Sequence, residues 1–154
     1  MTGNALEGDA LRALVPHRPP FLWLDGVRDI DPHRGGTGYL LIREDEPVLE
    51  GHFPGAPVFP GVLVLEAMGQ TAAAIAAAGR QDGSGAPDRV ALLGMDDIRF
   101  RAPVGPGDML ELEVTIERGG HGARIWQFRA EARVGDRTVC IARFTGMSQA
   151  TDAD

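Results

Sequence analysis

The feature that most restricts the fold of this chain is one long apolar segment, residues 62–78. Leu, Val, Ile, Met and Ala dominate it, Pro60 and Gly61 precede it, and Gly79 follows it. Proline suits the first position of a helix and glycine suits the left-handed position after its end, so the segment predicts a helix of about 20 residues, roughly 30 Å long. Because this helix would be apolar on nearly every side, we expect it to lie inside the molecule.

The same segment is not expected to cross a membrane. Glu66, Gly69 and Gln70 interrupt the apolar stretch of residues 58–78, and a charged group in the hydrocarbon core is costly. The first twenty residues hold no apolar run of the length that a signal peptide needs. We therefore expect a cytoplasmic protein that does not associate with membranes.

Strand-like segments flank the predicted helix on both sides. Alternation or β-rich composition marks residues 21–30, 37–43, 90–100, 109–117, 123–134 and 137–147. Glycine-containing turns, such as Gly135 with Asp136, predict hairpins between neighbouring segments. Residues 6–15 predict a short helix that Pro16 ends. The expected fold class is α+β, with about six mostly antiparallel strands wrapped around one central helix at about residues 60–79.

Length and charge exclude several classes of protein. The 154 residues suit a single domain spanning residues 1–154, in which the small, polar residues 148–154 are expected to fray. With 15 Lys and Arg against 22 Asp and Glu, the net charge is −7, whereas a nucleic-acid binder needs a basic surface. The single cysteine, Cys140, cannot form a disulfide within the chain and is expected to be a buried small hydrophobic residue. Four scattered histidines offer no ligand spacing, so we expect no metal and no cofactor.

Two polar side chains in the apolar helix point to chemistry. Glu66 and Gln70 are spaced i and i+4 and therefore share one face of the helix. An ionised carboxylate in an apolar interior must find partners or take up a proton, and a protonated glutamate near neutral pH can act as a general acid. A buried glutamate that an arginine or a loop amide anchors for structural reasons is the equal alternative.

A stiff loop and a helix start add two further candidates. His52 lies in a loop rich in proline and glycine, residues 51–57, which can hold its imidazole against the helix; taken by itself, a histidine that bonds within its own loop is the simpler interpretation. Gly61 leaves the first amides of the helix open to a ligand oxygen. A base, an acid and an amide pocket for an oxyanion together suit proton abstraction next to a carbonyl.

Three motifs in this part of the chain resemble the signature of the β-hydroxyacyl-acyl carrier protein dehydratases of the FabZ type. They are Gly-His-Phe-Pro-Gly at residues 51–55, Pro-Gly-Val-Leu at residues 60–63 and Glu-Ala-Met-Gly-Gln at residues 66–70. Residues 16–21, Pro-His-Arg-Pro-Pro-Phe, are similar to the family's N-terminal motif. The whole resemblance covers about residues 11–147.

This resemblance implies a hot-dog fold and an active site that two subunits share. The family forms homodimers, often assembled further as trimers of dimers, in which one subunit supplies the histidine and the other the glutamate. By resemblance, His52 is the catalytic histidine and Glu66 the catalytic glutamate. Related FabA-type enzymes, which also isomerise the double bond, place aspartate where this chain has Glu66, so dehydration without isomerisation is expected.

The resemblance also implies residues that bind the substrate and its carrier. Gly61 and Val62 match the helix amides that hold the thioester carbonyl, Gln70 matches a glutamine that supports the acidic residue, and Phe53 belongs to the matched histidine motif.

An acidic acyl carrier protein is the expected partner, and it would need a local basic patch on this acidic chain. Arg99 and Arg101 occupy positions where the family often has basic residues near the mouth of the substrate tunnel. Two arginines on the solvated face of a strand are the equal alternative.

The implied reaction removes water from a (3R)-3-hydroxyacyl-acyl carrier protein to give the trans-2-enoyl product, in fatty acid elongation. His52 would remove the proton at C2 and Glu66 would protonate the departing hydroxyl, an assignment that the sequence leaves open. The same dehydration in a polyketide or polyene pathway is the first alternative. A hot-dog thioesterase would have little use for His52, and an acyl-binding module without activity would have no need of the histidine and glutamate pair.

Some positions depart from the family's pattern or fall outside it. Many members have aromatic residues where this chain has Val90, Ala91 and Leu92, so the preferred acyl chain length is left open. Of the other histidines, His17 is expected to be structural, and His33 and His121 are expected to be exposed turn residues.

Overall fold

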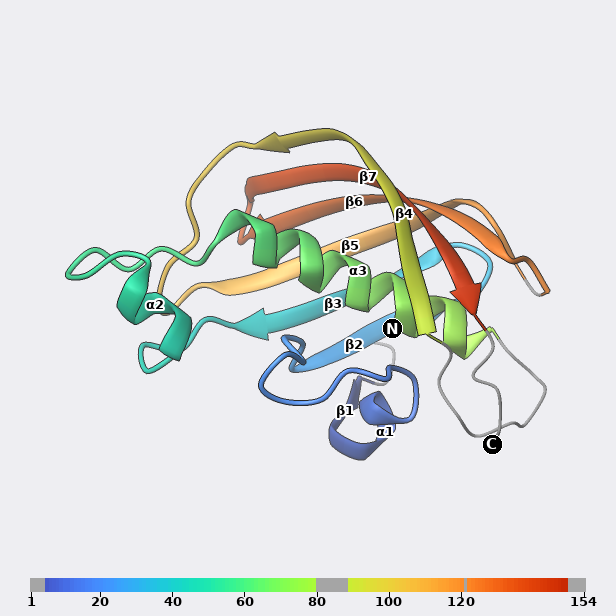
Figure 1. Ribbon diagram of the computed structural model, residues 1–154, viewed down its shortest axis with the longest axis horizontal. Coiled ribbons are helices and arrows are strands. Elements are labelled where there is room, and N and C mark those ends of the chain that lie inside the picture. Colours follow the sequence, from blue (N-terminus) through green and yellow to red (C-terminus); the bar gives the residue numbers. More distant parts are fainter. Residues whose placement is uncertain (1–4, 80–88, 121, 150–154) are drawn as a thin grey trace.

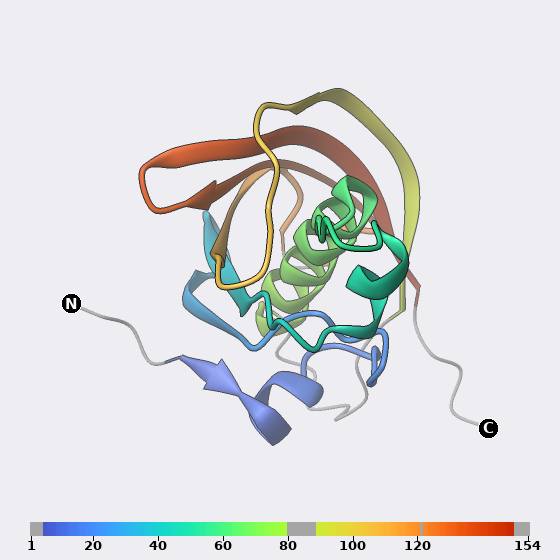
Figure 2. The same cartoon turned by 90° about the vertical axis from the view of Figure 1, so that its left-hand side faces the viewer.

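One antiparallel sheet curls around a central helix in the computed structural model, which describes residues 5–79, 89–120 and 122–149 (Figure 1). The described strands are β1 (Leu6–Glu7), β2 (Gly26–Asp31), β3 (Gly35–Leu41), β4 (Arg89–Phe100), β5 (Met109–Arg118), β6 (Ile125–Val134) and β7 (Arg137–Gln149). The described helices are α1 (Gly8–Arg12), α2 (Pro47–Gly51) and α3 (Gly61–Ala78). The strands are ordered β1-β2-β3-β5-β6-β7-β4. Seen along the helix in Figure 2, the sheet encloses α3 on several sides.

Alternation along the strands explains why one face of the sheet is buried. In β5, Leu110, Leu112 and Val114 point inward and are buried, whereas Glu113 and Thr115 between and beside them are exposed. Successive side chains of a strand point to opposite faces, so this period of two gives the sheet one apolar face. Register shifts between β4 and β7 bend the sheet, which allows it to wrap around the helix.

The contact between α3 and β3 depends on a glycine. A Cβ atom at Gly38 would lie 2.1 Å from Thr71 Oγ1, far inside van der Waals distance. Thr71 is fully buried, and its hydroxyl donates to the Ala67 carbonyl oxygen at 2.9 Å. The absent side chain at Gly38 therefore sets how closely the helix approaches the sheet.

The predicted central helix is confirmed, with one correction at its end. By length and composition alone α3 could cross a membrane, but 56% of it is buried inside the domain, as the core helix of a folded protein is. Gly79 has φ −79°, so the left-handed conformation predicted for it is wrong. A Cβ atom there would lie 3.2 Å from Pro32 Cβ, so close packing against Pro32 favours glycine at this position.

The predicted antiparallel sheet is also confirmed, with differences at its N-terminal edge. The expected helix at residues 6–15 shortens to α1, because residues 6 and 7 pair with β2 as β1. The strand expected from residue 21 begins at Gly26, and α2 was not predicted. Residues 148 and 149, expected to fray, belong to β7, while residues 150–154 and His121 lie outside the described residues.

Candidate active site

Glu66 lies on the second turn of α3 and is held by a residue one turn further on. Its Oε1 atom accepts a hydrogen bond of 3.0 Å from Gln70 Nε2. The Glu66 side chain remains about one third exposed, at 32%. The shared helix face expected for the two residues thus brings them into direct contact.

Gln70 also connects the helix to the irregular segment that follows α1. It is almost completely buried, with 1% exposed, and its Oε1 accepts from the Trp23 backbone N–H at 3.0 Å. Its Nε2 donates to the Phe21 carbonyl oxygen at 2.8 Å as well as to Glu66. The Gln70 side-chain amide therefore holds both Glu66, the candidate catalytic residue, and the main chain at Phe21 and Trp23.

A second side chain beside Glu66 was not expected in the site. His17 Nε2 lies 3.6 Å from Glu66 Oε1, and the His17 side chain is 27% exposed. Burial lowers the pKa of His17 below its ordinary value of 6.5; the nearby Glu66 carboxylate opposes this and the Arg18 guanidinium adds to it. The imidazole is therefore neutral at pH 7. Its Nδ1 is buried and has no hydrogen-bond partner among the described residues.

The loop that carries His17 is held by its neighbour. The Arg18 guanidinium donates to the carbonyl oxygens of Val15 and His17, each at 2.8 Å, and to that of Arg12 at 3.2 Å. Three carbonyl groups outside regular pairing thus share one charged donor. This side chain fixes the local shape of the loop, while Gln70 joins the chain to α3 at Phe21 and Trp23.

Glu66 and His17 both line an apolar cavity of about 270 Å³ between α3 and strands β4, β6 and β7. They are the only titratable groups among its described lining residues. The other lining residues are Val62, Leu65, Gly69, Ala72, Ala73, Leu92, Met95, Phe128, Phe144 and Gly146. The cavity can accept an apolar chain while presenting one carboxyl group at its wall.

His52 lies at the end of α2, apart from this cavity. Its Nδ1 is 2.7 Å from the Val58 carbonyl oxygen, and its ring stacks on Phe53 with centroids 4.1 Å apart. A carbonyl oxygen only accepts, so Nδ1 carries the proton and Nε2 keeps a lone pair that can accept one. No hydrogen bond or ion pair between described residues joins His52 to Glu66 within the chain.

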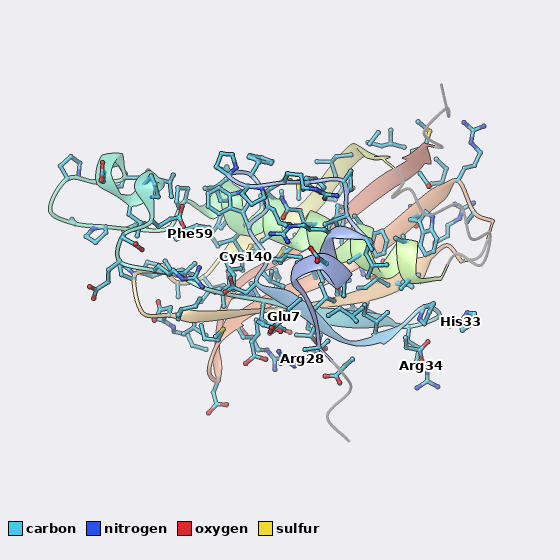
Figure 3. The ribbon with its side chains drawn as sticks, turned by 90° about the horizontal axis from the view of Figure 1, so that it is seen from below. Glu7, Arg28, His33, Arg34, Phe59 and Cys140 are labelled. Carbon is cyan, nitrogen blue, oxygen red and sulfur yellow. The ribbon has the colours of Figure 1, made fainter. Side chains whose placement is uncertain are left out.

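The start of α3 lies beside a second cavity, of about 530 Å³. Gly61 and Val62 line it together with Phe59 and Cys140, which Figure 3 labels. A Cβ atom at Gly61 would lie 2.7 Å from the Phe100 ring, so glycine allows that ring to approach the helix start. The Leu63 and Val64 amides bond to the Pro60 carbonyl oxygen, whereas no hydrogen bond between described residues uses the Gly61 or Val62 amide.

Comparison with known proteins identifies the family. Residues 15–143 match the model of the FabA-like domain. The 3-hydroxyacyl-[acyl-carrier-protein] dehydratase FabZ of Jannaschia sp. (strain CCS1) is 43% identical over 146 residues, which cover 95% of this chain and 90% of that protein. FabZ of Caulobacter vibrioides (strain NA1000 / CB15N) is 39% identical over 136 residues, covering 88% and 83%. The chain belongs to the FabZ dehydratase family.

Solved structures support the hot-dog fold of this FabZ family member. The dehydratase heterocomplex ApeI:P from Xenorhabdus doucetiae has a TM-score of 0.78 at 17% identity, covering 92% of this chain and 91% of that chain. A fluoroacetyl-CoA thioesterase, FlK, has a TM-score of 0.59 at 13% identity, covering 75% and 86%. At these identities the likeness concerns the fold alone, so the thioesterase neighbour does not assign a thioesterase activity.

Phe53, Arg99 and Arg101 are the other residues named for the FabZ site, and of these three Arg101 alone lines the second cavity. Phe53 is 54% exposed beside His52. Arg101 lines the cavity and Arg99 precedes it on β4, and both are exposed, without an ion pair to any other described residue. The described residues contain no cluster of metal-ligating side chains. Burial raises the pKa of Cys140 to about 11, so it behaves as the buried hydrophobic residue that the sequence predicted.

His17 is the residue that sequence reasoning assigned to structure alone. The structure places it against Glu66, 49 positions away from it along the chain. Its membership of residues 16–21, the motif similar to the family's N-terminal motif, was the available signal. No local pattern indicated which side chain it would meet.

Proposed function

We propose that this chain is a 3-hydroxyacyl-[acyl-carrier-protein] dehydratase of fatty acid synthesis and that two copies of it share each active site. The observation that carries the proposal is a carboxyl group, Glu66, held by buried Gln70 at the wall of an apolar cavity, in a member of the FabZ family. Such a cavity accepts the acyl chain, and the carboxyl group meets its 3-hydroxyl. The protein is a cytoplasmic lyase that needs no cofactor.

His52 acts as the general base in this proposal. The hydrogen bond between Nδ1 and the Val58 carbonyl oxygen keeps the proton on Nδ1 and directs the basic Nε2 outward. Nε2 takes the proton from C2 of the substrate, next to the thioester carbonyl. The imidazolium that results keeps its bond to the Val58 oxygen, which stabilises the new charge.

The start of α3 stabilises the enolate that forms when C2 loses its proton. The amides of Gly61 and Val62 are free to donate, and the positive end of the helix dipole favours a negatively charged oxygen there. The thioester carbonyl oxygen therefore binds at this helix end. Phe53, exposed beside His52, covers the bound thioester.

Glu66 acts as the general acid. Its proton joins the departing 3-hydroxyl group as water, while the electron pair of the former C2–H bond forms the double bond between C2 and C3. Glu66 is then a carboxylate and His52 an imidazolium. Transfer of the proton from His52 back to Glu66 through solvent restores both groups for the next turnover.

A second copy of the chain completes the site. His52 and Glu66 make no contact within one chain, so the histidine of one subunit serves the glutamate of the other. Large apolar side chains near the site are exposed in the single chain: Val62 by 69%, Leu92 by 59%, Phe100 by 56% and Leu93 by 53%. Covering them stabilises a homodimer, and three such dimers can assemble further.

The acyl carrier protein is the second partner. This chain has a net charge of −7, so an acidic carrier needs a local cationic surface on it. Arg99 and Arg101 are exposed and free of ion pairs with other described residues, close to the helix start where the thioester binds. They receive the carrier and its bound substrate.

Mixed dimers test the chemistry and the sharing together. We would incubate the purified protein with 3-hydroxyacyl carrier protein and follow the loss of one water by mass spectrometry. His52→Ala and Glu66→Gln should each abolish turnover while leaving circular dichroism unchanged. When the two variants are unfolded together in equal amounts and refolded, random pairing restores about a quarter of the wild-type sites.

Each alternative outcome has a clear meaning. If each variant alone is inactive and the mixture is inactive too, although it forms dimers, the two residues do not come from different subunits. If the folded wild-type dimer turns over no carrier-linked 3-hydroxyacyl chain of any length, the assignment as a dehydratase of this substrate class is wrong.

A further inference from the structure

We propose that His17 is a positioning residue for Glu66, which together with Gln70 directs two N–H donors at Oε1, so that the proton to be delivered is carried on Oε2. The role in dehydration rests on the proposed function. The contact itself does not, and it is testable in the folded protein without substrate. His17 would thereby fix which oxygen of the carboxyl group faces the departing hydroxyl.

The geometry around the carboxyl group is one-sided. Gln70 Nε2 lies 3.0 Å and His17 Nε2 lies 3.6 Å from the same oxygen, Oε1. No described residue makes a hydrogen bond or ion pair with Oε2. The 3.6 Å separation is slightly longer than a hydrogen bond, and bonds of this kind often shorten when substrate closes the site.

The surroundings of His17 select the tautomer that can donate to Glu66. The groups that face it are Glu66 from α3 and Arg18 from its own loop, and burial keeps the ring neutral at pH 7. A neutral imidazole carries one proton. Nδ1 is buried without an acceptor among the described residues, whereas Nε2 faces a carboxyl oxygen, and a buried N–H without an acceptor is costly. The proton therefore lies on Nε2.

The ring is held in place by bonds of its own backbone. Arg18 gathers the carbonyl oxygens of Val15, His17 and Arg12, and these three charge-assisted hydrogen bonds fix the local shape of the loop. Gln70 of α3 then joins the chain a few residues further on, at Phe21 and Trp23, to the helix. A positioning residue has to be fixed itself, and this arrangement provides it.

Two donors at one oxygen decide where a carboxylic acid carries its proton. An oxygen that accepts from Gln70 and His17 is the carbonyl-like oxygen, so the O–H group lies on the other one. After the proton has left, both N–H groups remain to stabilise the carboxylate. His17 therefore assists the departure of the hydroxyl group and has no part in the removal of the C2 proton.

Because His17 is assigned to the departure of the hydroxyl group alone, substrates with different leaving groups distinguish this role from a purely structural one. We would compare His17→Leu, His17→Gln and the wild type on a 3-hydroxyacyl carrier protein and on its 3-fluoro analogue, since fluoride leaves with little need of a proton. His17→Leu should lower kcat for the hydroxy substrate on the order of 10- to 100-fold, with KM nearly unchanged. It should leave fluoride release within about threefold of the wild type. His17→Gln places an amide N–H near the position of Nε2 and should recover most of the loss.

A second measurement needs no turnover. In protein labelled with ¹⁵N-histidine, NMR should show neutral His17 with its proton on Nε2 at pH 7. A proton on Nδ1 would overturn the proposal even if the protein dehydrates no substrate. Equal losses on the hydroxy and fluoro substrates would overturn it as well.

Discussion

Gln70 donates its side-chain amide to Glu66 at 3.0 Å while it also bonds to the backbone at Phe21 and Trp23. The acid of the proposed reaction and the N-terminal segment of the chain are thus fixed by the same buried residue. Because the side chain is 1% exposed, water cannot replace the bonds that it makes. Stability and catalysis should therefore fail together when Gln70 changes.

Replacing Gln70 by Leu should destabilise the protein. The Trp23 N–H and the Phe21 carbonyl oxygen would lose their partner, and we expect a loss of about 2–4 kcal/mol in the free energy of unfolding. Urea unfolding followed by circular dichroism measures it. His33→Gln, in the exposed turn after β2, is the matched control and should change stability little. An unchanged stability of Gln70→Leu would show that these bonds contribute nothing net.

A methyl group at Gly38 should separate the helix from the sheet. The new Cβ atom meets Thr71 Oγ1 at 2.1 Å, so Gly38→Ala should cost about 1–3 kcal/mol by overpacking. Adding Thr71→Ala removes the clashing hydroxyl and should recover part of the loss, which a double-mutant cycle in urea quantifies. Gly94→Ala, where a Cβ atom meets nothing within 4 Å, is the control. Additive effects of Gly38→Ala and Thr71→Ala would contradict this packing.

Stability should fall at alkaline pH through Cys140. Burial raises the pKa of this thiol from its ordinary value of 9.0 to about 11. Between these two values the unfolded chain releases the proton while the folded chain keeps it, so stability decreases as pH rises through that range. Denaturant unfolding from pH 8 to 11 should show a shallower decline for Cys140→Val than for the wild type. Parallel declines in the two proteins would refute the assignment.

Charge reversal at the proposed carrier surface should separate two kinds of substrate. Changing Arg99 and Arg101 to Glu should raise KM for the carrier-linked substrate by about tenfold, because an acidic carrier is then repelled. A short thioester that lacks the carrier should be turned over as before. Arg34→Glu, on an exposed arginine in the turn between β2 and β3, tests for a general charge effect. Equal losses on both substrates would place the arginines outside carrier binding.

The sequence predicted the parts of the fold that depend on local pattern. The apolar run of α3 predicts a buried helix and the alternation of β5 predicts a strand, and each pattern is complete within about ten to twenty residues. Residues 21–25 also look like a strand, but Gln70 takes up the backbone groups at Phe21 and Trp23, and the strand begins only at Gly26. Gln70 lies 47 positions away from Trp23 in the sequence. A local sequence pattern therefore cannot show that its side chain bonds to these backbone groups in place of a neighbouring strand.

The candidate site divides in the same way. Glu66 and Gln70 share a helix face because of their spacing, which the sequence states directly. His52 bonds to Val58 within its own loop, as the simpler interpretation expected, and that same bond leaves Nε2 free for the proposed base. The approach of His17 to Glu66 arises only when the N-terminal segment folds over α3, so residue types and spacing could not predict it.

Arg18 and Gln70 give an irregular stretch of chain a defined shape. Residues 13–25 belong to no helix or strand, yet one guanidinium collects carbonyl oxygens from within the stretch and one buried amide ties its far end to α3. Val15 and Leu24 of the stretch are buried in the core, and these apolar contacts add to the two sets of hydrogen bonds. Substitution of Arg18 or of Gln70 should loosen the whole stretch, because each of these side chains bonds to more than one backbone group in it.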